Sequence, residues 1–112
     1  MNARFTEIQD PQQLENLFQK SFEEPVVLFK HSLTCSISAH VYREISRADA
    51  EINLIIVQTA RSVSNRVAEQ TGIRHESPQA IVLRDGKAIF HASHFGITAE
   101  NIVQSSKFKV QS

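Results

Sequence analysis

Apolar residues recur along the chain in patterns that predict alternating helices and strands. From Leu14 onward they are three and four positions apart, which is typical of a helix with one buried face. Asp10 can cap this helix, Pro11 suits its first position, and Gln13 can reach back to complete a capping box. The apolar face of this helix is predicted to consist of Leu14, Leu17, Phe18 and Phe22.

Two short apolar runs predict buried strands. They are residues 26–29 and 52–57, each rich in β-branched residues and apolar on both faces. A weaker pattern is compatible with a strand over residues 4–8. Because a helix is predicted between the two buried strands, these strands should be parallel with a right-handed crossover. The inward face of that helix carries Ile37, Val41 and Ile45, with Tyr42 beside it.

A third helix is predicted in the middle of the chain. Thr59 or Ser62 can cap its start, and Val63 and Val67 face inward. Gly72 then ends the helix as a glycine C-cap.

The C-terminal part predicts a hairpin and a last helix. Asp85-Gly86 stands between the β-rich runs 80–83 and 88–90, and this dipeptide is the strongest short-range hairpin signal. Thr98 can cap a helix that carries Ile102 and Val103, and the alternation of Phe108 and Val110 with polar residues is compatible with a short docked end.

The resulting order of elements is (β)α-βαβ-α-ββ-α. It predicts an α/β, thioredoxin-like fold, in which a mixed central sheet with a C-terminal antiparallel hairpin is flanked by helices. A chain of 112 residues buries about two thirds of its surface on folding, which suffices for a core without metal or disulfides. We therefore expect a single thioredoxin-like domain over residues 1–112.

Charge and composition narrow the possible partners. Twelve Lys and Arg residues balance 12 Asp and Glu residues, which disfavours nucleic acid and a membrane surface as partners. Apolar runs are too short to span a bilayer, and the N-terminus lacks the features of a secretory signal. These observations predict a cytoplasmic location.

The lone cysteine, Cys35, is the first candidate for chemistry. It follows the first buried strand, and Thr34 can cap the next helix, which would make Cys35 the first helical residue. Backbone N–H groups at a helix start favour a thiolate, the nucleophile of thiol–disulfide exchange. Ser38 occupies the position of a resolving cysteine, so a partner sulfur must come from another molecule. The alternative is an inert cysteine in the core.

Ser77-Pro78 is the second candidate. A proline that opens a strand opposite the Cys35 loop is what a thioredoxin-like site requires, and a cis bond there would expose the Ser77 backbone to an extended substrate. The alternative is a trans proline at the start of an edge strand.

With these residues in view, the chain resembles the YtxJ family, the monothiol bacilliredoxins of the C type. The resemblance spans residues 26–98. Its segments are Leu28-Phe29-Lys30-His31-Ser32, Thr34-Cys35-Ser36-Ile37-Ser38, Ile56-Val57-Gln58, Arg61, Val63-Ser64-Asn65, Gly72-Ile73, His75-Glu76-Ser77-Pro78-Gln79-Ala80, Ala92-Ser93-His94 and Ile97-Thr98.

The resemblance implies thiol redox chemistry linked to bacillithiol, a low-molecular-weight thiol. The catalytic cysteine maps to Cys35 and the family's cis-proline to Pro78. Bacillithiol would be a co-substrate, with no bound cofactor, and the partners would be S-bacillithiolated client proteins. The family usually has proline where this chain has Ser36, which leaves rate and preferred substrate open. The residues expected to contact substrate are Thr34, Ser36, Ser38, Ser77 and Pro78.

Other interpretations remain at this point. His91 and His94, with His75, invite a metal site, although no acidic residue or cysteine lies between positions 87 and 99, and no metal is expected. His31 could act as a base for Cys35. A non-catalytic module that carries a bacillithiol adduct is the main alternative function. A glutathione-linked monothiol glutaredoxin is a further variant, whose usual binding signals are not evident.

Overall fold

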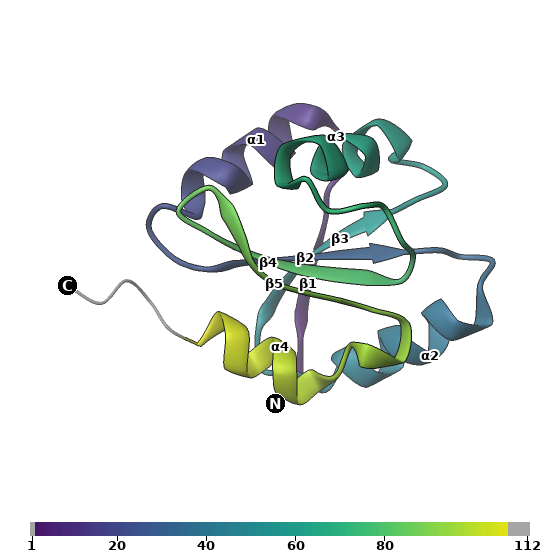
Figure 1. The fold of residues 1–112 in the computed structure, drawn as a ribbon. Coiled ribbons are helices and arrows are strands. Elements are labelled where there is room, and N and C mark those ends of the chain that lie inside the picture. Colours follow the sequence, from purple (N-terminus) through teal and green to yellow (C-terminus); the bar gives the residue numbers. More distant parts are fainter. Residues whose placement is uncertain (1, 108–112) are drawn as a thin grey trace.

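A five-stranded sheet with helices on both faces forms the core of the structure, as Figure 1 shows. The computed structural model describes residues 2–107. Its elements follow the predicted order. They are β1 (Arg4–Glu7), α1 (Pro11–Lys20), β2 (Val26–His31), α2 (Ser36–Ile45), β3 (Glu51–Ile56), α3 (Arg61–Thr71), β4 (Gln79–Arg84), β5 (Lys87–Ser93), the short 3-10 helix η1 (His94–Gly96) and α4 (Ala99–Ser106).

The sheet is mixed, as predicted. Its strand order is β1-β3-β2-β4-β5; β3 is parallel to β1 and to β2, while β4 is antiparallel to β2 and to β5. The hairpin turns at Asp85 and Gly86, which both have positive φ angles, of 54° and 76°. Two central residues with positive φ give the turn the twist of the flanking strands, which confirms the Asp-Gly prediction.

Two hydrophobic cores lie on opposite faces of the sheet. Helices α1 and α3 cover one face and α2 and α4 the other (Figure 1). Side chains alternate along β2, so that Val26 and Leu28 belong to the core under α1 and α3, while Val27 and Phe29 belong to the other. This alternation decides which face each residue at the end of β2 meets.

Local capping signals predict two helix starts correctly. Asp10 and Gln13 form the reciprocal capping box of α1, and Thr98 and Asn101 form that of α4. Gly72 ends α3 in the left-handed conformation, with φ 73°, as predicted.

The prediction for the start of α3 is wrong. Its N-cap is Ala60, without a side-chain cap, whereas Thr59 precedes it and Ser62 lies within the first turn. The reason is a backbone turn, since the N–H groups of Thr59 and Ala60 both donate to the carbonyl of Ile56 and set the entry into the helix.

Phe22 is also corrected. Helix α1 ends at Lys20, and Phe22 is 54% exposed rather than part of the apolar face. Ser21 causes this departure, because its buried hydroxyl donates to the carbonyl of Phe18 and accepts from the N–H of Gly86. The turn sends the Phe22 ring against Gly86, where a Cβ would lie 2.9 Å from Phe22 Cζ.

Two further predictions concern the ends and the membrane. The docked end at Phe108 and Val110 lies outside the described residues. Within residues 2–107, none of the helices combines the length and the apolar character needed to cross a bilayer.

Candidate functional site

Cys35 lies where β2 has ended and α2 begins. It is the N-cap of α2, with extended backbone angles of φ −109° and ψ 123°, and it is half-buried. The helix therefore starts at Ser36, and the predicted N-cap Thr34 is wrong by one residue. The physical reason is that the Thr34 hydroxyl accepts from Gln58 Nε2 at 3.3 Å instead of from a helix N–H.

The N-cap Cys35 makes no side-chain cap hydrogen bond at the start of α2 within the described residues. The first N–H groups of a helix lack partners within the helix, and they stabilise negative charge placed before them. Ser36 is exposed at the first helical position. The arrangement therefore leaves these backbone groups beside a partly accessible sulfur.

Ser38 is fully buried and fixes the turn that carries Cys35. Its hydroxyl accepts from the N–H of Ser32 at 3.0 Å and lies 2.7 Å from Nδ1 of His31. The hydroxyl thus joins the end of β2 to the first turn of α2. The hydroxyl is therefore engaged inside the protein. The predicted contact of Ser38 with substrate stays a prediction.

His31 faces α2 rather than solvent. Its ring stacks on Tyr42 with 5.0 Å between centroids, and it also stacks on Phe29. Burial lowers the pKa of His31 below its ordinary value, which favours a neutral ring at pH 7. In the described part of the chain no hydrogen bond joins His31 to Cys35, so a role as its base stays a prediction.

Gln58 ties the loop before Cys35 to the end of β3. Its Oε1 accepts from the N–H of Leu33 at 3.1 Å, and its Nε2 donates to Ser32 Oγ at 2.8 Å. Sequence reasoning assigned it no role. The available signal was its position in one of the segments that carry the family resemblance.

Ser77 and Pro78 lie at the same end of the sheet as Cys35. Lys30, near the end of β2, pairs with Gln79, the first residue of β4. Because these two strands are antiparallel neighbours, Pro78 and the loop after β2 lie at the same end of the sheet. The loops from β2 to α2 and from α3 to β4 both lie at the right in Figure 1. The Ser77–Pro78 peptide bond is cis, and β4 is an internal strand rather than an edge strand.

Two polar groups of the Ser77–Pro78 segment differ in their hydrogen bonding. Pro78 is buried, and its carbonyl accepts from the N–H of His94 at 3.0 Å. The hydroxyl of Ser77 is buried and lacks a hydrogen-bond partner among the described residues. Ser77 therefore retains unused hydrogen-bonding capacity beside the cysteine loop.

Sequence reasoning missed a buried polar cluster under this loop. Lys30 is buried, and its Nζ lies 3.0 Å from the carbonyl oxygen of Ser64 and 3.1 Å from Nδ1 of His75. Burial lowers the pKa of Lys30 to about 8. All three residues belong to segments that carry the resemblance, which was the signal available.

The histidines that invite a metal site lie in different surroundings within residues 2–107. His75 contacts Lys30, whereas His91 lies in β5 and His94 in η1, where its Nδ1 is 3.9 Å from Glu76 Oε1. A hydrogen bond with Ser93 is the main cause that lowers the pKa of the Glu76 carboxyl. Across residues 2–107, no group of three metal-ligating side chains lies close enough to hold an ion.

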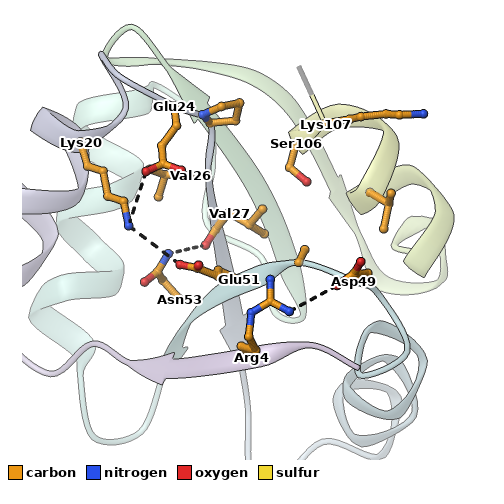
Figure 2. Close-up of a pocket in the computed structure, with 13 residues that line it drawn as sticks. Arg4, Lys20, Glu24, Val26, Val27, Asp49, Glu51, Asn53, Ser106 and Lys107 are labelled. Carbon is orange, nitrogen blue, oxygen red and sulfur yellow. Dashed lines mark hydrogen bonds and ion pairs between the residues drawn. The ribbon is translucent and has the colours of Figure 1, made fainter. Parts of the chain in front are cut away.

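A cavity of about 420 Å³ lies at the opposite end of the sheet (Figure 2). It opens beside the first residues of β2 and β3 and is crossed by two exposed sets of ion pairs. These join Arg4 to Asp49, and Lys20 to Glu24 and Glu51. The cavity holds neither Cys35 nor the Ser77–Pro78 loop in its lining, so its size does not mark the candidate site.

Comparison with known structures establishes the fold class. A solved protein described as a candidate oxidoreductase with a thioredoxin fold is 28% identical, with a TM-score of 0.82 over 90% of this chain and 92% of its own. Thioredoxin from Schistosoma mansoni aligns with a TM-score of 0.68 at 15% identity, covering 96% and 99% of the two chains. Spinach chloroplast thioredoxin f aligns at 0.67 and 12%, covering 95% and 93%. The predicted thioredoxin-like fold is confirmed.

Within this class, the family follows from the sequence match. Residues 6–102 match the model of the family described as monothiol bacilliredoxin BrxC. The chain belongs to this family. Together with the oxidoreductase-like neighbour, membership supports thiol oxidoreductase activity.

Proposed function

We propose that this protein reduces protein–bacillithiol mixed disulfides, with Cys35 as the only nucleophile. The observation that carries the proposal is the position of Cys35, half-exposed at the uncapped start of α2. The thiolate is the attacking species in thiol–disulfide exchange, and a helix N-terminus stabilises an anion. Family membership supports bacillithiol mixed disulfides as the class of substrate.

The proposed reaction is an exchange of sulfur partners in two steps. First, the Cys35 thiolate attacks the bacillithiol sulfur, the bond between client and bacillithiol breaks, and the client leaves as a thiolate that takes a proton from water. Second, a bacillithiol thiolate attacks the adduct on Cys35, which releases bacillithiol disulfide and restores the cysteine. Overall, one disulfide replaces another: the client cysteine is reduced to a thiol, and the free bacillithiol thiol is oxidised as it joins the bacillithiol taken from the client in the new disulfide.

Ser77 and Pro78 are proposed to align the client. They lie at the same end of the sheet as Cys35, and the Ser77 hydroxyl has no hydrogen-bond partner within residues 2–107. Which sulfur is attacked depends on alignment, so a backbone contact there would select the bacillithiol sulfur. Thr34 and Ser36 flank Cys35 in the chain, are exposed, and are proposed to contact the small thiol.

The absence of a second cysteine determines how the cycle ends. Serine at position 38 cannot form a disulfide, and its hydroxyl is bound to His31 and Ser32. A free thiol from solution must therefore resolve the adduct. Such a cycle needs a compartment that keeps bacillithiol reduced, consistent with the cytoplasmic location expected from the sequence.

A turnover experiment tests the proposal against the non-catalytic alternative. Catalytic amounts of protein are mixed with excess bacillithiolated client and free bacillithiol, and release of client thiol is followed. We expect many client thiols released per protein molecule with the wild type and background release with Cys35→Ser. If the wild type releases one equivalent and stops, the protein carries an adduct without catalysing its transfer.

A further inference from the structure

The buried side chain of Lys30 is not used in the proposed reaction, yet it lies beside the candidate site. Only 1% of the residue is exposed, and Nζ contacts two neutral groups, the carbonyl of Ser64 and Nδ1 of His75. Among the ion pairs of residues 2–107, none involves Lys30. Burying an ammonium group without a counter-charge is costly, so its contacts are its main compensation.

These contacts join β2 to two segments that are distant from it in sequence. Ser64 belongs to α3, whereas His75 lies in the loop between α3 and β4, three residues before Pro78. The adjacent strand β4 contributes a second contact to the same loop. Gln79 pairs with Lys30 across the two strands, and Gln79 Nε2 donates to the carbonyl of Arg74 at 2.9 Å. Two neighbouring side chains on one face of the sheet thus hold two consecutive residues of the loop.

The ammonium group also determines the state of the His75 ring. A protonated amine has no acceptor, so Nδ1 must accept from Nζ, and the ring proton resides on Nε2. The pKa of His75 is lowered by burial first and then by the charges of Lys30 and Arg61, which outweigh the carboxylate of Glu76. The ring is therefore neutral at pH 7 and bound through the nitrogen that faces the protein. Ser64 Oγ, 3.2 Å from the same nitrogen, completes the cluster.

We propose that Lys30 is a positioning residue that acts through His75 to hold the Ser77–Pro78 segment in the orientation needed to align a protein client. The proposal extends the proposed function and rests on it. Lys30 does not touch the reacting sulfurs. Its effect is confined to substrates whose backbone must lie along Ser77, whereas a small disulfide reaches Cys35 without that alignment.

Saturation kinetics on Lys30→Met and His75→Ala test this role. Methionine keeps most of the lysine stem but removes the donors, and His75 is exposed, so its loss spares the core. We expect KM for a bacillithiolated client protein to rise about tenfold in each variant, with kcat within about twofold. Exchange with a small aromatic disulfide such as dithiodipyridine should stay within about twofold. Because both variants break the same contact, that between Lys30 and His75, the double variant should be no worse than the more impaired single variant.

Lys20→Met is the matched control. It makes the same exchange at an exposed lysine at the opposite end of the sheet, and its KM should equal that of the wild type. The proposal is overturned if Lys20→Met impairs client exchange as much as Lys30→Met does. It is also overturned if KM is unchanged in either test variant, or if the two defects multiply in the double variant.

Limited proteolysis separates this proposal from the proposed function. Arg74 is an exposed trypsin site within the held segment. Release of the segment in Lys30→Met should speed cleavage after Arg74 about tenfold relative to the wild type and Lys20→Met. If the wild type does not exchange with the bacillithiolated client, the proposed function fails while the cleavage rate still decides whether Lys30 holds the segment. Unchanged cleavage after Arg74 would contradict the holding role.

Discussion

The two ends of the central sheet use polar residues in opposite ways. At the end that carries Cys35, Lys30 and Ser38 are almost fully buried and make specific contacts across distant segments. At the other end, the cavity of about 420 Å³ is lined by charges that remain in solvent; the side chain of Arg4, for example, is 58% exposed. The cavity at that end is bordered by charges in solvent, whereas the costly burial of polar groups is at the Cys35 end.

This difference shows which property points to chemistry. Exposed ion pairs contribute little to stability and constrain little, because water screens them. Buried polar groups cost free energy unless each one is partnered, so they persist where a definite geometry has to be maintained. At the Cys35 end, adjacent residues of β2 serve opposite faces: His31 fastens the α2 loop through Ser38, and Lys30 fastens the Pro78 loop through His75.

The largest stability effect should follow from breaking the Ser38 contact. Ser38→Ala leaves the His31 ring nitrogen and the Ser32 N–H without their partner, at a cost of about 2 kcal/mol. Urea denaturation measures this loss in the free energy of unfolding, provided that the dependence of that free energy on urea concentration is the same for both proteins. The exposed serine at position 62 provides the control, since Ser62→Ala should change the free energy of unfolding by less than about 0.5 kcal/mol. Equal stability of Ser38→Ala and the wild type would contradict the fastening role of Ser38.

The buried ammonium group should make stability depend on pH in a defined direction. The pKa of Lys30 is about 8 in the folded protein and 10.5 as its ordinary value, so between these limits only the unfolded chain binds the proton. The wild type should therefore gain stability relative to Lys30→Met as pH rises through that window, by about 2 kcal/mol between pH 7 and pH 10. Parallel urea denaturation of both proteins measures this gain. A difference between them that does not change with pH would contradict the buried charge.

Replacing Ser36 by proline, the residue that the family usually has at this position, should have a smaller effect on stability. Ser36 is the first residue of α2, where a backbone N–H has no helical partner and proline is favoured. Ser36→Pro should stabilise the protein by about 0.5 kcal/mol by restricting the unfolded chain. Thermal unfolding measures the change. A loss of more than about 1 kcal/mol would show that the Ser36 N–H has a structural role.

The smallest effect is expected at the opposite end of the sheet. Arg4→Ala removes the exposed ion pair with Asp49 that Figure 2 shows, and should cost less than about 0.5 kcal/mol. Client exchange should equal that of the wild type. A loss of exchange comparable to that of Lys30→Met would mean that both ends of the sheet contribute to the site.

Much of the fold could be predicted because its signals are local. The capping pairs Asp10–Gln13 and Thr98–Asn101 each lie within four residues, and the Asp85-Gly86 turn depends only on its own φ angles. Errors occurred where a distant group competed with a local signal. Gln58, 24 residues away, binds the hydroxyl of Thr34, which sequence reasoning assigned to the helix cap.

The candidate site could be predicted only in part for the same reason. Cys35 and Pro78 could be identified from their residue types and from their positions next to predicted strands. Lysine is rarely buried, so nothing local indicates that Lys30 turns inward. Its partners lie 34 and 45 positions further along the chain, and only the folded sheet brings them together.

Intact-mass analysis of a single turnover tests whether Cys35 is the nucleophile of the exchange. Reduced protein is mixed with an equimolar client that carries one bacillithiol, and both masses are followed with time for the wild type and Cys35→Ser. We expect that one bacillithiol moves to the wild type as the client thiol is freed, with no transfer to Cys35→Ser. A wild type that takes up no bacillithiol, while its Cys35 alkylates only after unfolding, would contradict the role of Cys35 as the nucleophile.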